Sequence, residues 1–248
     1  DPLVRQPLLK RLHDMRERQW EAAPTFKAEV PGEIAPITAP FDHGMRIGTR
    51  RDASAEEVDD ALARAEAIQP AWDALGGEKR ALLLEAAADE FEAHTDEILS
   101  LCQLEAGKTI VDSVLELREA VDFLRYYANE ARRLFTEPTQ LPGPTGEHNY
   151  MKLAGRGVFA TISPWNFPLA IFIGPAAAAL AAGNTVIAKP AEQTPLIAHR
   201  AVELFIEAGC PRAALQLLPG RGEVVGAALT SDSRVKGVIF TGSTEVAQ

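Results

Sequence analysis

The chain has 248 residues, 46% of them hydrophobic, and a formal net charge of −10 at pH 7. A chain of this length can bury a full core and form one large domain or two ordinary ones. Its acidic balance argues against binding to nucleic acid or an anionic membrane surface, because both require clustered positive charge. Cys102 and Cys210 show no disulfide or metal-ligand spacing, so we expect no bound metal and a reducing, cytoplasmic location.

Helical patterns dominate residues 1–137. Apolar residues repeat at helical spacing over residues 2–19, whereas residues 20–53 are mainly polar and contain proline and glycine. Ser54 and Glu57 fit a capping box that begins a helix ending near Trp72. Gly107 marks a later helix end. We predict two sets of buried residues at helical intervals. The helix that follows Trp72 would bury Leu82, Leu83, Ala86 and Ala87, and the helix that follows Gly107 would bury Val114, Leu117, Val121, Leu124 and Ala128.

A break follows at residues 138–155, where proline and glycine recur from Pro138 to Gly146. Beyond it, short apolar runs alternate with helical stretches. The predicted strands are 158–162, 185–188, 215–218 and 238–240, and the predicted helices are 168–181, 195–208 and 223–230. Such alternation is typical of βαβ units. We therefore predict an α/β fold: a doubly wound, Rossmann-like parallel sheet in residues 156–248 and a helical shell in residues 1–137.

Residues 157–188 carry no charged side chain, which raises the question of a membrane span. Pro164, Pro168 and the pair Gly183-Asn184 interrupt the segment where a strand, a turn and a buried helix would join. We therefore expect no membrane span.

Ligands of open parallel sheets bind beyond the carboxyl ends of the strands. Each predicted strand is followed there by polar residues or glycine: Trp165 and Asn166, Lys189 and Glu192, Gly220 and Gly222, and Gly242 and Ser243. The last pair begins a helix, whose free N–H groups can hold a pyrophosphate. The pattern predicts one dinucleotide site, with the nicotinamide at the first loop and the adenosine ribose at the second.

Two of these loops allow a second interpretation. Glu192 could accept hydrogen bonds from the ribose and repel a 2′-phosphate, favouring NAD over NADP; alternatively, Lys189 and Glu192 form a surface ion pair worth about 0–1 kcal/mol. The segment from Gly220 to Gly226 has one residue too many for a Rossmann fingerprint. It is either a tight strand-to-helix turn or a place where the cofactor approaches the backbone.

Asn166 also has two possible roles, as the cap of a turn or as an amide donor to a developing oxyanion. A nucleophile is missing. Cys102 lies in an apolar helical pattern, Cys210 follows a helix end without a neighbouring base, and the five histidines show no catalytic or metal spacing.

In their order and register, these residues resemble motifs of the aldehyde dehydrogenase superfamily. The motifs are Ser-Pro-Trp-Asn-Phe-Pro at 163–168, Gly-Asn at 183–184, Lys-Pro-Ala-Glu at 189–192, Leu-Pro-Gly at 218–220 and Phe-Thr-Gly-Ser-Thr at 240–244. More narrowly, residues 105–109, 118–127 and 189–195 are similar to the glutamate-semialdehyde (1-pyrroline-5-carboxylate) dehydrogenase module of bifunctional proline utilization A proteins.

The resemblance implies a role for each motif. Asn166 would donate to the oxyanion of a cysteine thiohemiacetal, Phe167 would wall the aldehyde tunnel, and Glu119 would receive the substrate's amino group. The residues that it places at the cofactor, NAD, are Ile162, Pro164, Trp165, Lys189, Glu192, Gly222, Gly226, Phe240, Gly242, Ser243 and Val246.

The same resemblance implies oxidation of L-glutamate γ-semialdehyde to L-glutamate, through a thiohemiacetal and a thioester, in proline catabolism. It also implies a homo-oligomer in which residues 138–155 form an oligomerisation arm. FAD would belong only to a separate proline dehydrogenase module of a bifunctional parent.

The family's cysteine and glutamate lie downstream of the Gly-Ser-Thr segment. We therefore expect the chain, from Asp1 to Gln248, to be part of a longer protein and to be inactive alone. Two alternatives remain: an aldehyde dehydrogenase for another substrate, including a CoA-acylating one, or a noncatalytic subunit that binds nucleotide or assembles with a full-length partner.

Overall fold

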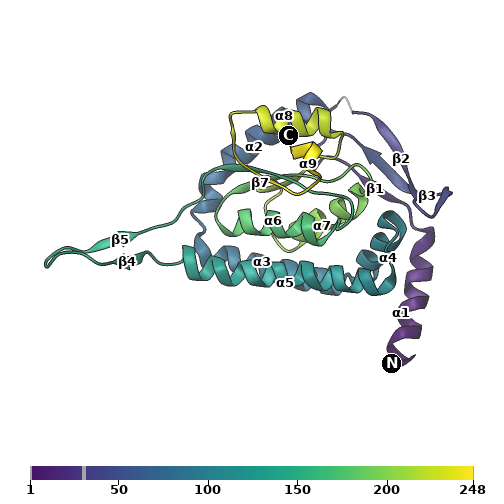
Figure 1. Ribbon diagram of the computed structural model, residues 1–248, viewed down its shortest axis with the longest axis horizontal. Coiled ribbons are helices and arrows are strands. Elements are labelled where there is room, and N and C mark those ends of the chain that lie inside the picture. Colours follow the sequence, from purple (N-terminus) through teal and green to yellow (C-terminus); the bar gives the residue numbers. More distant parts are fainter. Residues whose placement is uncertain (1, 30–31, 248) are drawn as a thin grey trace.

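The computed structural model describes residues 2–29 and 32–247, which form a sheet-centred body with a projecting hairpin (Figure 1). The helices are α1 (Pro2–Asp14), η1 (Met15–Glu17), α2 (Ala55–Asp73), α3 (Gly76–Ala93), α4 (Thr95–Ala106), α5 (Ile110–Phe135), α6 (Ala170–Ala181), α7 (Pro195–Glu207), η2 (Gly222–Gly226), α8 (Ala227–Ser231) and α9 (Thr244–Ala247). The strands are β1 (Trp20–Ala22), β2 (Ile34–Ala39), β3 (Asp42–Arg51), β4 (Thr139–Leu141), β5 (Asn149–Met151), β6 (Val158–Ile162), β7 (Thr185–Lys189), β8 (Leu215–Leu217) and β9 (Val235–Phe240).

The predicted parallel sheet is confirmed, with strand order β8-β7-β6-β9. Ile162 at the end of β6 pairs with Lys189 on one side and Phe240 on the other. Strand β9 begins at Val235, three residues before the predicted start. Because all four strands are parallel, their carboxyl ends lie at one edge of the sheet.

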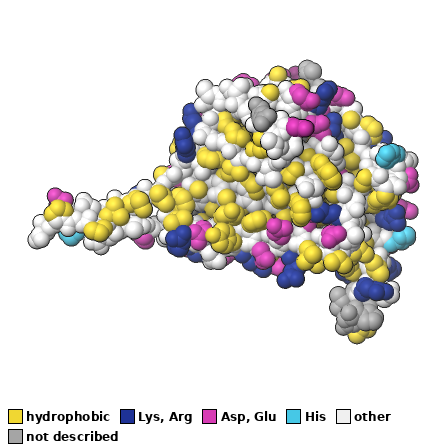
Figure 2. Space-filling model, viewed as in Figure 1, with side chains coloured by type: hydrophobic (Ala, Val, Ile, Leu, Met, Phe, Trp, Pro, Cys, Tyr) yellow, Lys and Arg dark blue, Asp and Glu magenta, His cyan; other side chains and the backbone are white. Residues whose placement is uncertain are grey.

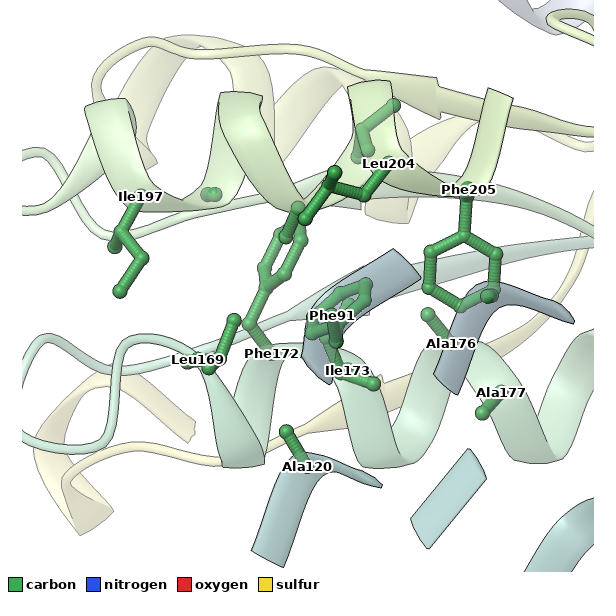
Figure 3. Packing of buried hydrophobic residues seen from close by; sticks show 14 of the residues in the cluster. Phe91, Ala120, Leu169, Phe172, Ile173, Ala176, Ala177, Ile197, Leu204 and Phe205 are labelled. Carbon is green, nitrogen blue, oxygen red and sulfur yellow. The ribbon is translucent and has the colours of Figure 1, made fainter. Parts of the chain in front are cut away.

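The sheet is covered on both faces, as predicted for a doubly wound fold. Alternate residues of β7 point to opposite faces: Val186 and Ala188 join the core formed with α3 to α7, whereas Ile187 joins a smaller core beneath α2, η2 and α8. In the larger core, the rings of Phe91 and Phe205 meet edge to face with centroids 6.0 Å apart (Figure 3).

The phase of α3 differs in part from the prediction. Ala87 is buried as predicted, but Leu82 is 53% exposed, and α3 also buries Ala81, Leu84, Ala88 and Phe91. The predicted phase of α5 is confirmed: Leu117, Val121, Leu124 and Ala128 are buried, and only Val114 is exposed. The run of three leucines at 82–84 is compatible with several phases of the helix, so the packing partners of α3 determine which leucine is buried.

The prediction of a helical shell over residues 1–137 is wrong for residues 20–53. They include a three-stranded sheet of order β1-β3-β2, in which β1 runs parallel and β2 antiparallel to β3. These strands carry many polar and exposed residues, so they lack the continuous apolar pattern that revealed the main sheet. Strand β3 contributes to the site because Arg50, next to its last residue, contacts the loop that carries Glu192.

Several local predictions are confirmed. The side chain of Ser54 accepts a hydrogen bond from the Glu57 amide and Glu57 returns one to the Ser54 amide, which completes the capping box. Gly107 ends α4 in the left-handed conformation, with φ 68°. The break after α5 contains the β4–β5 hairpin, which extends away from the body and exposes Leu141, Tyr150 and Met151 (Figures 1 and 2).

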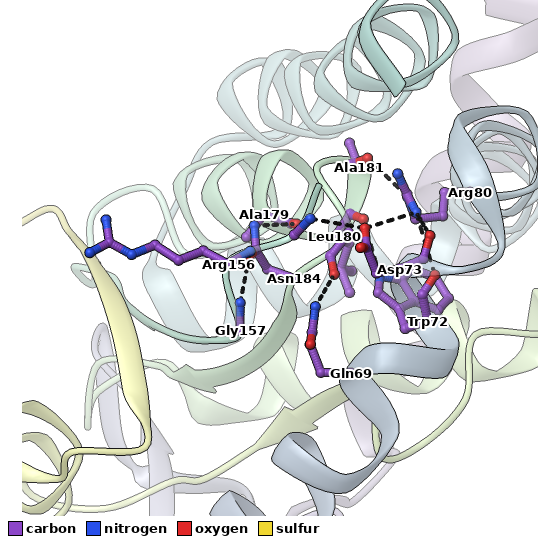
Figure 4. A network of polar contacts seen from close by, with 12 residues as sticks. Gln69, Trp72, Asp73, Arg80, Arg156, Gly157, Ala179, Leu180, Ala181 and Asn184 are labelled. Atoms are coloured by element: carbon purple, nitrogen blue, oxygen red, sulfur yellow. Dashed lines mark hydrogen bonds and ion pairs between the residues drawn. The ribbon is translucent and has the colours of Figure 1, made fainter. Parts of the chain in front are cut away.

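Polar contacts fix the opposite edge of the sheet, where β6 and β7 begin (Figure 4). The Asn184 side chain accepts hydrogen bonds from the amides of Arg156 and Gly157, and Asp73 accepts one from Gly155. Buried Arg80 donates to the Ala181 carbonyl at the end of α6. The Gly183-Asn184 motif therefore has a structural role.

The uncharged segment 157–188 forms β6, α6 and β7. In the described part of the chain, no helix combines the length and the apolar character needed to cross a membrane.

Candidate functional site

The loops after the parallel strands meet at one edge of the sheet. Backbone hydrogen bonds continue beyond the strands: Ser163 donates to Lys189 at 3.3 Å, Thr241 to Ile162 at 3.0 Å, and Leu218 to Ala188 at 3.0 Å. The segments that begin at Ile162, Lys189, Leu218 and Thr241 therefore lie side by side, as the sequence predicted.

The predicted ribose residues converge. Gly222 donates its amide to Oε1 of Glu192 at 2.8 Å, and a Cβ built on Gly226 would lie 3.7 Å from Cδ of Lys189. Lys189 is only 4% exposed and donates from Nζ to the Pro190 carbonyl at 2.9 Å. Lys189 and Glu192 form no direct ion pair in the described structure, so the alternative of a surface ion pair is wrong.

Burial lowers the pKa of Lys189, an effect that the nearby Glu192 carboxylate opposes. A buried ammonium with several charged neighbours marks this edge as a candidate binding site. The Glu192 carboxylate is half-buried and held by a backbone amide, so its position is fixed without a ligand.

The glycine segment forms the tight turn that was one of its two interpretations. Gly220 has φ 149°, and a Cβ there would lie 2.5 Å from Cγ2 of Val225, so glycine is required. After Arg221, residues Gly222–Gly226 form the single-turn π-helix η2, an element that recurs at functional sites. Close cofactor approach at Gly222 and Gly226 stays a prediction.

The first loop is open. Trp165 and Phe167 are 56% and 40% exposed, and Asn166 is exposed as well. Within the described residues, the Asn166 amide has no hydrogen-bond partner, so the structure does not show it capping a turn. The predicted oxyanion role requires such a free amide donor.

The remaining predicted residues lie around the same edge or on α5. Ile162, Pro164 and Phe240 are half-buried, whereas Gly242, Ser243 and Val246 are exposed. The Val246 amide donates to Oγ of Ser243 at 3.4 Å. Glu119 is exposed on α5, one turn beyond Glu116.

Two buried glutamates were missed by the sequence analysis. Glu105 of α4 accepts hydrogen bonds from the amides of Leu196 and Ile197, at 2.6 and 2.8 Å. Glu116 of α5 accepts from Leu169 and Ala170, at 2.8 and 3.2 Å. Each carboxylate therefore holds the first turn of the helix that follows one candidate loop. The sequence did contain a signal for these two residues: each glutamate lies on the same helical face as the buried leucines of its helix.

Lys108 links Glu116 to the loop that carries Asn166 and Phe167. Its Nζ is ion-paired with Oε2 of Glu116 and lies 4.2 Å from the centroid of the Phe167 ring. Glu105 has no such cationic partner among the described residues, and burial raises its pKa from 4.5 to about 8.

Both cysteines are buried. Burial is the main cause that raises the pKa of Cys102, and burial raises that of Cys210 to about 12. A nucleophilic cysteine needs a lowered pKa and access to substrate, so neither residue fits that role.

Two cavities and one group of possible metal ligands lie away from this edge of the sheet, and none of them includes a predicted site residue. Two cavities of about 400 and 340 Å³ lie along α7 and beside α1 and α4. Glu90, His94 and Glu207 have ligand atoms within 4.8 Å of one another, a grouping that chain spacing did not reveal. The Glu207 carboxylate is already paired with Arg200 at 2.7 Å.

Comparisons with known proteins show the family of the chain. The family model described as "Aldehyde dehydrogenase family" matches residues 27–248. The bifunctional protein PutA of Klebsiella aerogenes is 49% identical over 230 residues, which are 92% of this chain and 16% of that protein.

Two crystal structures are also similar. Proline utilization A of Bradyrhizobium japonicum is 45% identical with a TM-score of 0.80, over 98% of this chain and 22% of that one. A 1-pyrroline-5-carboxylate dehydrogenase from Thermus with bound NAD is 33% identical with a TM-score of 0.93, over 99% of this chain and 48% of that one. The chain thus spans less than half of these proteins. Since the family model covers nearly all of it, the chain belongs to the aldehyde dehydrogenase family.

Proposed function

We propose that this chain supplies the NAD-binding part of an enzyme that oxidises L-glutamate γ-semialdehyde to L-glutamate. The observation that carries the proposal is the convergence of Lys189, Glu192 and Gly222 next to a loop with an unpartnered Asn166 amide. The relatives named PutA and 1-pyrroline-5-carboxylate dehydrogenase, the latter with bound NAD, support the substrate and the cofactor.

In this proposal, the two ends of the site have different tasks. Glu192 and Lys189 bind the adenosine ribose, because a carboxylate at this strand end accepts hydrogen bonds from ribose hydroxyls. Gly242 and Ser243 lie at the pyrophosphate, where α9 begins. Ile162, Pro164, Trp165, Gly222, Gly226, Phe240 and Val246 line the rest of the cofactor site. NAD, when bound, accepts the hydride that the aldehyde carbon loses on oxidation.

Substrate contacts lie at the first loop. Asn166 donates its amide to the oxygen that becomes negatively charged, while Phe167 borders the aldehyde and Glu119 receives the substrate's amino group. Because Cys102 and Cys210 are buried with raised pKa values, we propose that the attacking thiol comes from outside these 248 residues. The chain alone then binds cofactor without turnover.

The projecting hairpin has the features of an assembly element. Residues 138–155 expose Leu141, Tyr150, Met151 and Leu153 on a two-stranded arm, and an isolated hairpin is marginally stable in water. We include in the proposal that this arm packs against another copy of the chain.

Equilibrium titration of the chain with NAD tests the cofactor assignment. We expect Glu192→Ala to weaken NAD binding about tenfold, the effect of losing one or two hydrogen bonds to a charged acceptor. Glu66→Ala on the exposed side of α2 is the matched control. Equal NAD affinity in the chain and in Glu192→Ala, with both folded by circular dichroism, would remove the ribose assignment.

The substrate assignment needs a full-length family enzyme that carries this segment. We expect its kcat/KM to be higher with glutamate semialdehyde than with an aldehyde of the same length that lacks the amino group. Glu119→Gln should reduce this preference. An enzyme without the preference would be an aldehyde dehydrogenase for another substrate.

A further inference from the structure

A pair of oppositely charged side chains lies beside the proposed ribose loop, and it belongs to β3 and the residue after it, in the part of the chain where the sequence predicted no sheet. Arg50 in β3 donates from Nη1 to the backbone carbonyl of Glu192 at 2.9 Å. Its Nε lies 2.6 Å from Oδ1 of Asp52, and the two side chains are only 13% and 10% exposed. A second contact joins Nη2 of Arg50 to Oδ2 of Asp52 at 3.3 Å. The guanidinium is therefore held between Asp52 and the loop that carries Glu192.

Carboxylates outnumber cations around this point. The charges of Glu192, Arg50, Asp52 and Glu223 all act on the Lys189 ammonium, and Glu33 acts on Asp52. Arg221 lies 3.8 Å from Glu223, so three cations face four carboxylates. Burial raises the pKa of Asp52, and Glu33 and Glu192 raise it further against the opposing effect of Arg50. The local field is thus unfavourable to a further anion.

A ribose 2′-phosphate would be such an anion, with a charge of about −1.5 to −2 at neutral pH. Enzymes that use NADP accept this phosphate with an arginine near the ribose, because a guanidinium binds phosphate in a bidentate manner. Arg50 is in contact with the ribose loop, but Asp52 already pairs with its Nε and Nη2.

We propose that Asp52 is a specificity-determining residue: by pairing with Arg50 and adding a carboxylate beside Glu192, it makes the site reject a ribose 2′-phosphate and select NAD over NADP. The proposal rests on the proposed function and extends it from Glu192 to the residue that follows β3. Asp52→Asn keeps the shape of the side chain, removes its charge and frees Arg50.

The test compares NAD and NADP affinities of the chain in equilibrium titrations. We expect Asp52→Asn to increase NADP affinity about tenfold, as removal of a nearby like charge predicts, and to change NAD affinity less than about twofold. The double variant Arg50→Gln/Asp52→Asn should lose most of the gain, because the freed guanidinium is absent. Glu66→Gln removes one carboxylate on α2 and should leave both affinities unchanged.

Salt gives a second measurement that needs no variant. Screening weakens the repulsion of the 2′-phosphate, so NADP affinity of the unaltered chain should rise relative to NAD affinity as ionic strength increases. If Asp52→Asn does not fold, Asp52→Ser, which also removes the carboxylate, is titrated in its place.

The results of these titrations distinguish a failure of the Asp52 proposal from a failure of the proposed function. Normal NAD binding with the same NADP-to-NAD ratio in Asp52→Asn, or a ratio independent of salt, would overturn this inference and leave the proposed function standing. A folded chain without measurable NAD affinity would overturn the proposed function itself.

Discussion

The two helices that follow the candidate loops are anchored in chemically different ways. Helix α6 follows the Asn166 loop, and its first amides bind Glu116, whose charge is matched by Lys108. Helix α7 follows the Glu192 loop, and its first amides bind Glu105, which pairs with no cation in the part of the chain that the structure describes and has a pKa raised to about 8. A helix N-terminus favours a negative charge, but burial without a counter-ion is the larger effect at Glu105. The two ends of the site should therefore respond differently to pH and to mutation.

The largest expected effect is the pH dependence from Glu105. Between its ordinary pKa of 4.5 and about 8, the unfolded state loses the proton while the folded state keeps it. The protonated Glu105 side chain therefore contributes fully to the free energy of unfolding below pH 4.5, and this contribution is lost as the pH rises to about 8. At about 1.4 kcal/mol per pKa unit, the loss is about 4–5 kcal/mol.

Urea unfolding of the chain and of Glu105→Gln across this pH range measures that loss. The stability of Glu105→Gln relative to the unaltered chain should improve steadily as pH rises. If the free energies of unfolding of the two proteins changed with pH in the same way, Glu105 would be ionised in the folded state like Glu116, and the two helix anchors would not differ.

At the other end, Asn166→Ala should affect turnover and leave the cofactor end intact. Loss of one oxyanion donor costs about 3–4 kcal/mol of transition-state stabilisation, or about 10²–10³-fold in kcat. Steady-state kinetics of a full-length family enzyme carrying this segment measure the change, with NAD affinity as the internal control. Unchanged kcat with several aldehydes would exclude the oxyanion role.

Lys108→Met should destabilise the chain by about 3 kcal/mol, because it leaves the Glu116 carboxylate buried without its cation. The double variant Lys108→Met/Glu116→Gln should recover most of that loss, since no buried charge remains. Thermal and urea unfolding give both values. A single variant as stable as the unaltered chain would show that the ion pair does not anchor α6.

The smallest effect concerns the ring above Lys108. Phe167→Leu removes a cation–π contact at an exposed position, worth about 0.5–1 kcal/mol. A double-mutant cycle with Lys108→Met isolates this coupling in urea unfolding. Zero coupling would mean that the loop carrying Asn166 is not linked to the Lys108–Glu116 pair.

Local patterns in the sequence were sufficient for the main sheet, the Ser54 cap and the left-handed Gly107. Buried parallel strands read as continuous apolar runs, caps are set by neighbouring residues, and a left-handed helix end favours glycine. The order of motifs also identified the loops that meet at the sheet edge, because parallel strands bring their carboxyl ends together.

Only the tertiary structure decided which residues support those loops. Arg50 and Asp52 lie in a mixed polar segment with no strand pattern, and Glu105 and Glu116 occupy ordinary helical positions in the sequence. Their partners are 142 residues away for Arg50 and 91 residues away for Glu105. No local rule contains such contacts, since burial and partner choice are set by how the sheets and helices pack.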